Sequence, residues 1–141
     1  MNILILQGPN LNLLGLRSSA NENNRITLDK LNKALRRHSR NKDVCLKILQ
    51  THKQFQAINF LQRNRNWANG VLFIPTSWAR NEYTIAETLS LISLPTAIVY
   101  FNKSFSFGTS QDESIMKTPK SSSFTGDPIS ASCKALDYLL I

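Results

Sequence analysis

The chain has 141 residues, 42% of them hydrophobic, and its 17 Lys and Arg residues against 9 Asp and Glu residues give a formal net charge of +8. This length suits one compact domain over residues 1–141, and two separate cores would be cramped in it. No stretch approaches the roughly 20 apolar residues that a membrane-crossing helix needs, which excludes a membrane-spanning protein. The apolar run over residues 1–6 is too short for a signal peptide, so we expect a cytoplasmic protein.

Short apolar runs alternate with stretches that have helical spacing. In chain order, this pattern predicts a strand over 2–6, a helix capped by Thr27, a strand over 44–49, a helix over 55–65, a strand over 70–74, a helix over 82–92, a strand over 96–101 and a last helix with Pro128 in its first turn. Residues 102–123 are polar and rich in Ser, Thr and Lys, so we expect mostly loop there.

Each predicted helix has one apolar side that should face a core. The expected inward residues are Leu28, Leu31 and Leu35 in the first helix, Phe55, Ile58, Phe60 and Leu61 in the second, Ile85, Leu89 and Ile92 in the third, and Ile129, Ala135, Leu136 and Leu139 in the last. Strands that alternate with helices of this length imply right-handed βαβ units and a central parallel sheet. The sequence therefore predicts an α/β fold.

Ligands in such folds bind beyond the carboxyl ends of the strands, near the point where the strand order reverses. The segments that follow the predicted strands are thus the candidate ligand-binding segments: residues 7–17, 50–54, 75–81 and 102–109.

The cysteines and histidines are few and far apart. Cys45 and Cys133 are not close enough in sequence for a metal knuckle or a C-x-x-C redox pair, and we expect two buried thiols, with a disulfide as the alternative. His38 and His52 lack the spacing of metal ligands. We therefore expect no metal and no cofactor.

The segment after the first predicted strand reads Gly8-Pro9-Asn10-Leu11-Asn12-Leu13-Leu14-Gly15. Its composition alone indicates a turn, with two Asn side chains that can hydrogen-bond a ligand or the backbone. As a string it closely resembles the N-terminal signature of the type II 3-dehydroquinases, and Arg17 falls where that family has an arginine of the catalytic site. The similarity continues over residues 69–101, where the matching positions include Pro75, Leu89, Ser93 and Pro95.

This resemblance implies a three-layer flavodoxin-like fold, with a central parallel sheet flanked by helices, that assembles into trimers and dodecamers. It also implies a reaction in which an activated tyrosine on a mobile loop removes a proton beside a ketone. The resulting enolate is held by a water that an asparagine positions. A histidine, oriented by a glutamate, then protonates the departing hydroxyl group.

Most of these catalytic groups have no counterpart at the matching positions. Residues 18–25 contain no tyrosine, and the asparagine, histidine, glutamate and second histidine positions hold Ile74, Arg80, Ile98 and Tyr100. Two downstream arginine positions hold Phe107 and Gln111. Asn12 and Arg17 match the family, and Glu87 stands in place of its aspartate on the third helix.

Other residues could substitute for the missing groups. Arg80 stays protonated near neutral pH and cannot exchange a proton, whereas Tyr100, Tyr83, His52 and Lys53 are candidates. A tyrosine of the core or of an interface is the competing interpretation of Tyr100. General acid–base groups contribute about 10²–10⁴-fold each, so the loss of base, acid and orienting carboxylate should leave almost no dehydratase turnover.

Three functions follow from these observations. The first is a non-catalytic relative that binds a small anion, with candidate ligand-binding residues Asn10, Asn12, Arg17, Arg80, Glu87 and Asn102, although Arg17 and Arg80 could equally be solvated or paired with Glu22 and Glu82. The second is an active lyase, acting on 3-dehydroquinate or a related substrate through rearranged groups.

The third function is binding of nucleic acid or an acidic partner by a basic surface. The residues that suggest it are Lys30, Lys33, Arg36, Arg37, Arg40, Lys42, Arg63 and Arg65. Because the sequence has no helix-turn-helix, zinc finger or RNA-binding aromatic motif, a solvated basic face is the favoured interpretation, and nucleic acid is not an expected partner.

Overall fold

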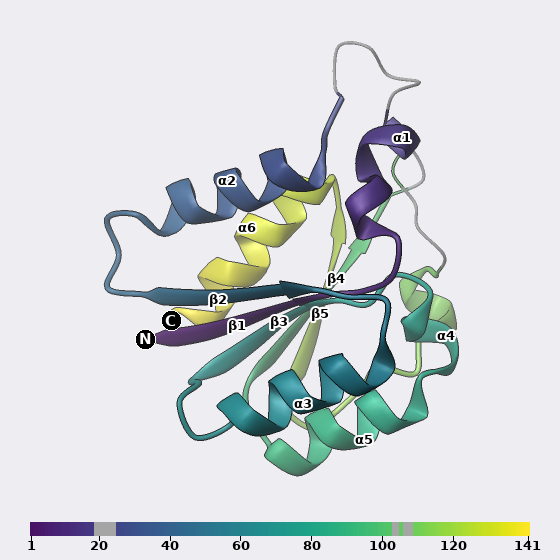
Figure 1. Cartoon of the computed structure of the whole chain (residues 1–141). Helices are drawn as coiled ribbons and strands as arrows, with labels where there is room; N and C mark the ends of the chain where they lie inside the picture. Colours follow the sequence, from purple (N-terminus) through teal and green to yellow (C-terminus); the bar gives the residue numbers. More distant parts are fainter. Residues whose placement is uncertain (19–24, 103–104, 106–108) are drawn as a thin grey trace.

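Helices cover both faces of one five-stranded parallel sheet in the computed structural model of the chain (Figure 1). The structure describes residues 1–18, 25–102, 105 and 109–141, except the side chains of Arg17 and Ser18. The strands are β1 Asn2–Gln7, β2 Cys45–Gln50, β3 Gly70–Ile74, β4 Thr96–Phe101 and β5 Ser121–Gly126. The helices are α1 Leu14–Ser18, α2 Leu28–Ser39, α3 Gln54–Asn64, α4 Trp78–Asn81, α5 Tyr83–Ile92 and α6 Pro128–Leu139.

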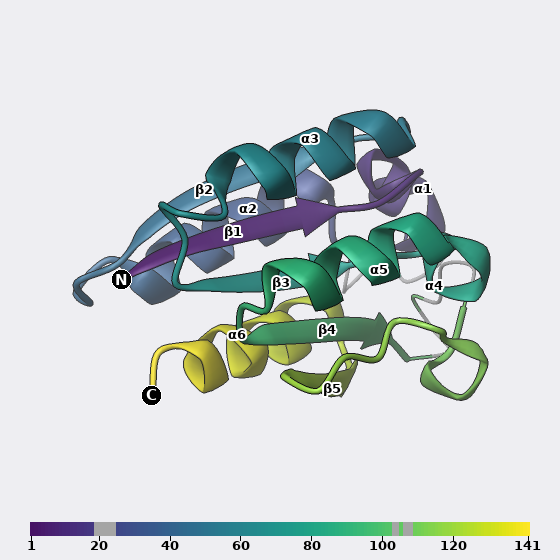
Figure 2. The same cartoon turned by 90° about the horizontal axis from the view of Figure 1, so that it is seen from below.

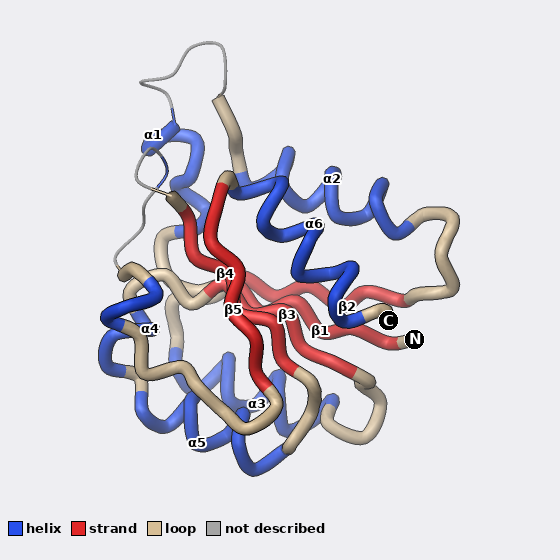
Figure 3. Tube along the Cα trace, turned by 180° about the vertical axis from the view of Figure 1, so that it is seen from behind, coloured by secondary structure: helices blue, strands red, loops and turns tan. Residues whose placement is uncertain are grey.

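The strands lie in the order β2-β1-β3-β4-β5, and each neighbouring pair is parallel. The order reverses between β1 and β3, because the chain passes from β1 outward to β2 and then back across β1. Helices α2 and α6 cover one face of the sheet, and α3 and α5 cover the other (Figures 1 and 3). The carboxyl ends of the strands meet at one edge of the sheet, beside α1 and α4. The α/β prediction is confirmed.

Two of the predicted helices, α2 and α6, begin with a side-chain cap. The Thr27 hydroxyl accepts a hydrogen bond from the Lys30 amide at 3.2 Å, and the Asp127 carboxylate accepts from the amides of α6 just after Pro128. Along β1 the side chains alternate between two fully buried clusters, with Ile3 on the α2 and α6 side and Leu4 on the α3 and α5 side. Burial on both faces explains why β1 is a continuous apolar run.

The expectation of loop over residues 102–123 is wrong at its end, because β5 begins at Ser121. β5 pairs in parallel with the whole of β4, from Thr96 opposite Ser121 to Phe101 opposite Gly126. Its sequence, SSSFTG, has one large apolar residue and therefore no alternating pattern. The backbone hydrogen bonds with β4 form this edge strand, and backbone pairing leaves no signature in the side chains.

The structure corrects three other expectations, namely that the side chains of Phe55, Cys45 and Cys133 are buried. Phe55 lies near the start of α3 and is 60% exposed. The buried residues of α3 are Ala57 and Leu61. Cys45 is exposed because β2 is an edge strand, and Cys133 is only half-buried. Both thiols are free. Burial and the nearby Asp137 carboxylate raise the pKa of the Cys133 thiol, which disfavours the reactive thiolate.

Within the described ranges, no helix is long and apolar enough to cross a bilayer.

Candidate functional site

Two turns, one after β1 and one after β3, are joined at the carboxyl edge of the sheet. The Gly8 amide donates to the Ile74 carbonyl at 2.8 Å. The Thr76 hydroxyl lies 2.8 Å from the Pro9 carbonyl oxygen, and Thr76 has a positive φ of 53°. A Cβ at Gly8 would lie 2.3 Å from the Pro75 carbonyl oxygen, so the close approach of the two turns requires glycine. Thr76 lies in the predicted ligand-binding segment 75–81 but was not singled out, because nothing in that segment indicates its contact with Pro9.

The end of β2 packs against the same turn. The Gln50 side-chain amide donates to the Gly8 carbonyl at 3.0 Å, and the Asn10 backbone amide donates to His52 Nδ1 at 3.1 Å. Because Nδ1 accepts this bond, the neutral His52 ring has its proton on Nε2. The structure therefore brings one of the predicted substitute groups, His52, into contact with the signature segment.

The space between the ends of β3 and β4 is small. A cavity of about 10 Å³, room for about one water molecule, is lined by Ile74, Thr76, Val99, Tyr100, Phe101 and Thr109. The Ile74 side chain is only 1% exposed and belongs to the core on the α2 and α6 side. Among the described residues that line it, the buried Thr109 hydroxyl has no hydrogen-bond partner.

Tyr100 borders this cavity but lies in the interior. Its side chain is 3% exposed, and its hydroxyl lies 2.5 Å from the Ser114 hydroxyl oxygen. Burial raises the pKa of Tyr100, and hydrogen bonds with Ser114 and Ser123 offset only part of that rise. Of the two interpretations of Tyr100, this burial fits a tyrosine of the core and not one that projects from a strand end into a ligand site. A raised pKa also makes Tyr100 a poorer proton acceptor near neutral pH.

Arg80, on α4, is exposed at the same edge. Its guanidinium Nη2 lies 3.0 Å from Glu113 Oε2, and Glu113 Oε1 also accepts from the Ser110 hydroxyl at 3.2 Å. The expected partner Glu82 instead accepts a hydrogen bond from the Gln54 side chain, and Glu22 lies outside the described residues. Sequence reasoning missed Glu113 because the chain that follows β4 returns to α4, where the Ile115 amide donates to the Ala79 carbonyl at 2.7 Å.

The remaining predicted residues are only partly brought together. Asn10 and Asn12 are exposed in the turn after β1. Asn102 is exposed at the end of β4, where its backbone amide donates to the Gly126 carbonyl at 2.9 Å. Glu87 is exposed within α5. The backbone of Arg17 lies in α1, but its side chain, like all of Phe107, falls outside the described part of the chain.

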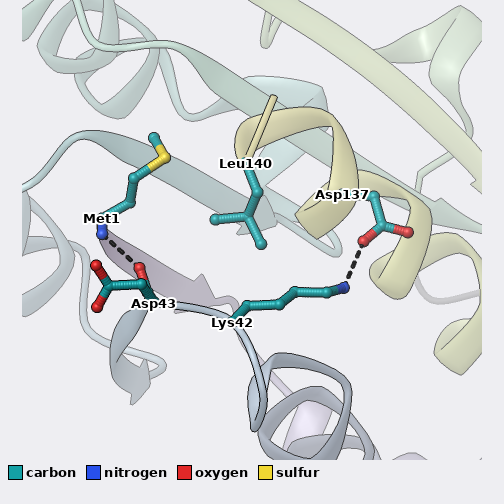
Figure 4. Close-up of a pocket in the computed structure, with 5 residues that line it drawn as sticks. All are labelled: Met1, Lys42, Asp43, Asp137 and Leu140. Carbon is teal, nitrogen blue, oxygen red and sulfur yellow. Dashed lines mark hydrogen bonds and ion pairs between the residues drawn. The ribbon is translucent and has the colours of Figure 1, made fainter.

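A wider hollow of about 420 Å³ lies at the opposite end of the sheet, among Met1, Lys42, Asp43, Asp137 and Leu140 (Figure 4). Lys42 Nζ and His38 Nε2 both contact Asp137 Oδ1, at 3.0 and 2.7 Å. Although burial alone would raise the pKa of Asp137, these two hydrogen bonds lower it. The contacts fasten α2 and the loop after it to α6. Because parallel sheets bind ligands at their carboxyl ends, we place the candidate site at the edge formed by Gly8, Ile74 and their neighbours.

In the part of the chain that the structure describes, no three His, Cys, Asp or Glu side chains are grouped so that they could hold a metal ion.

These features define a doubly wound α/β protein whose candidate site lies at the switch point between β1 and β3. The model of the family described as dehydroquinase class II matches residues 1–140. The chain therefore belongs to the class II dehydroquinase family, and the predicted family resemblance is confirmed.

Curated relatives with the name 3-dehydroquinate dehydratase are similar to most of the chain. The protein of Dictyoglomus turgidum is 28% identical over 102 residues, which cover 72% of this chain and 70% of that relative. The protein of Clostridium botulinum (strain 657 / Type Ba4) is 28% identical over 101 residues, covering 72% of this chain and 68% of the relative.

Solved structures share the fold along nearly the whole chain. The type II dehydroquinase from Butyrivibrio crossotus has a TM-score of 0.82 at 21% identity, with 99% of this chain and 97% of that chain covered. A 3-dehydroquinate dehydratase-like protein from Bifidobacterium longum has a TM-score of 0.66 at 15% identity, with 99% and 95% covered. These likenesses confirm the three-layer fold.

Proposed function

We propose that this chain keeps the class II dehydroquinase scaffold without dehydrating 3-dehydroquinate at an ordinary enzymatic rate, and that its carboxyl edge binds a small anion. The observation that supports the absence of ordinary turnover is the small space beside Ile74, whose volume is about 10 Å³. A six-membered ring with a carboxylate and hydroxyl groups does not fit there without movement of Ile74 and its neighbours.

The chemistry of the lining supports the same conclusion. Ile74 and Ile98 are buried in the two cores and cannot transfer a proton. Arg80 stays protonated, and burial raises the pKa of Tyr100. Ile74, Arg80, Ile98 and Tyr100 therefore supply no base near neutral pH, and the protonated Tyr100 hydroxyl lies in the interior.

Anion binding is supported by the exposed ion pair between Arg80 and Glu113, whose atoms lie 3.0 Å apart. Such exposed pairs contribute only about 0–1 kcal/mol, so a carboxylate or phosphate ligand can displace Glu113 at little cost. A guanidinium binds either anion through two parallel hydrogen bonds. The exposed Asn10 and Asn12 amides at the same edge can donate to the ligand's other oxygens.

We expect turnover of 3-dehydroquinate below about 0.1 s⁻¹, a hundredfold under the enzymatic median of roughly 10 s⁻¹. The measurement is the ultraviolet absorbance of the conjugated enone product at saturating substrate. The matched control is the relative from Dictyoglomus turgidum, assayed in the same buffer. A turnover of the full chain within a hundredfold of the median would refute the proposal.

The second candidate function, an active lyase with rearranged groups, is favoured by the names of the curated relatives and by the contact of His52 with Asn10. The same assay distinguishes it. If the chain turns over substrate and His52→Gln removes that activity while circular dichroism stays unchanged, His52 is the acid–base group of a rearranged site.

We also propose that copies of the chain associate in trimers, and that trimers assemble into dodecamers, as the resemblance implies. Tyr83 and Leu91 of α5 support association, because these large side chains are 69% and 76% exposed. Light scattering after size exclusion is expected to give three or twelve times the 15.9 kDa of one chain. A mass of 15.9 kDa would contradict this.

A further inference from the structure

The excess positive charge of the chain lies in one segment. Residues 25–65 contain eleven of the 17 Lys and Arg residues and only two of the 9 Asp and Glu residues. The rest of the sequence holds six basic and seven acidic residues, so it is close to neutral. If the fold keeps residues 25–65 together, their net positive charge is concentrated on one part of the protein surface.

The fold does keep it together, because the segment comprises α2, β2 and α3. β2 is an edge strand, and α2 and α3 lie on the two faces of the sheet beside it (Figure 2). We call the exposed side chains of these three elements the β2-edge surface. Arg36 and Arg37 on α2 and Arg40 at its C-terminal cap, together called the α2 arginines, are exposed and form no ion pair among the described residues. Their charges are available to an anionic partner.

A groove lies next to β2 on its α3 side. Its volume is about 340 Å³, and it is lined by Leu49, Gln56, Asn59, Phe60, Arg63 and Asn64. Beside it, Lys47 Nζ lies 3.0 Å from Asn64 Oδ1 and 4.1 Å from the centre of the Trp67 ring. The groove thus combines a half-buried aromatic ring, three side-chain amides and a guanidinium, with a lysine at its border.

We propose that the β2-edge surface binds single-stranded nucleic acid, with a base in the groove against Phe60 and with phosphates at Arg63, Lys47 and the α2 arginines. A half-buried ring offers a stacking surface, and Asn and Gln amides can pair with the edges of an unstacked base. The sequence alone favoured a solvated basic face, since no nucleic-acid-binding motif is present. The aromatic, amide-lined groove beside that charge is the additional observation.

The groove favours single-stranded nucleic acid over two other anionic partners, an acidic polypeptide and duplex DNA. An acidic polypeptide would be attracted by the charge but would not need a ring and amides in a groove. In duplex DNA the bases are stacked on one another, so their faces are not available to lie against the Phe60 ring. Neither alternative uses all of the observed features. The inference does not depend on the function proposed above, because the β2-edge surface and the carboxyl edge are built from different side chains.

The test is fluorescence anisotropy of the full chain with a labelled 20-nucleotide oligouridylate. If four phosphates are contacted, raising the salt from 50 to 200 mM should weaken binding about 50-fold. The double variant Lys47→Glu with Arg63→Glu should weaken binding at least tenfold. The matched control, Lys117→Glu with Lys120→Glu, makes the same change in net charge outside residues 25–65 and should weaken binding less than threefold.

Polyphosphate and polyglutamate of 20 units, used as competitors, separate base contacts from charge. We expect both to compete at least tenfold less well than unlabelled oligouridylate. Equal competition by either polymer would overturn the proposal, since charge alone would then account for binding. Equal effects of the two double variants, or no binding at 50 mM salt, would also overturn it. If the full chain does not bind oligouridylate and the double variant Lys47→Glu with Arg63→Glu has a different mass in solution, the β2-edge surface is instead an interface between copies of the chain.

Discussion

Replacing Gly8 with alanine is expected to destabilise the fold by about 3 kcal/mol or more, or to prevent folding. The added Cβ would lie 2.3 Å from the Pro75 carbonyl oxygen and 2.8 Å from its carbonyl carbon, and both are backbone atoms that cannot rotate away. Separating the turns would also break the hydrogen bond from the Gly8 amide to Ile74, which contributes roughly 1 kcal/mol. Urea unfolding followed by circular dichroism measures the loss.

The matched control for this prediction is Gly126→Ala, at the end of β5. There the nearest atom to an added Cβ is the Ala131 Cβ at 3.6 Å, an ordinary contact. We expect a change within about 1 kcal/mol. If Gly8→Ala were as mild as Gly126→Ala, the turns after β1 and β3 would not be held together as closely as the structure has them, and the closed shape of the candidate site would be in doubt.

The two glycines also show what could be predicted from the sequence. Gly8 belongs to the string on which the family resemblance depends, and the strand before it is a continuous apolar run, so the turn and its place in the fold were predictable. The reason for the glycine was not, because it depends on the Pro75 carbonyl, 67 residues further along the chain. Contacts between turns at a sheet edge have no local signature.

The lack of a local sequence signature also explains why β5 was missed and why the burial of Phe55 and Cys45 was misjudged. Strands β1 and β3 were predictable because both of their faces are buried, and every residue from Gly70 to Ile74 is buried. β5 was missed because its three serines give no apolar pattern, while the strand is defined by its backbone pairing with β4. Phe55 and Cys45 were misjudged because an apolar residue type does not show which helix side faces the sheet or which strand lies at its edge.

The candidate site was predictable in its location and only partly in its contacts. The reversal of strand order puts the ends of β1 and β3 together, as the element order implies. The contacts that decide its chemistry come from residues that no motif marks. Glu113 pairs with Arg80, Ser114 holds the Tyr100 hydroxyl, and His52 meets Asn10. Each joins segments that are separated in sequence.

Replacing Ile74 with asparagine, the residue that the family resemblance implies there, is expected to cost about 3–6 kcal/mol of unfolding free energy. The Ile74 side chain is 1% exposed, so its removal loses about 2–3 kcal/mol of apolar burial. A buried amide without its full set of partners adds roughly 1–3 kcal/mol. Among the described residues, the hydroxyl of Thr109 is the one buried, unpartnered polar atom of the cavity beside it.

The control is Ile74→Val, which removes one methylene group and should cost only about 1 kcal/mol. Turnover of 3-dehydroquinate should stay below about 0.1 s⁻¹ in both variants, since neither introduces an acid or a base. If Ile74→Asn were as stable as Ile74→Val and raised turnover, the space between β3 and β4 would be able to open around a polar side chain. The closed interior, and with it the proposed loss of dehydratase activity, would then have to be abandoned.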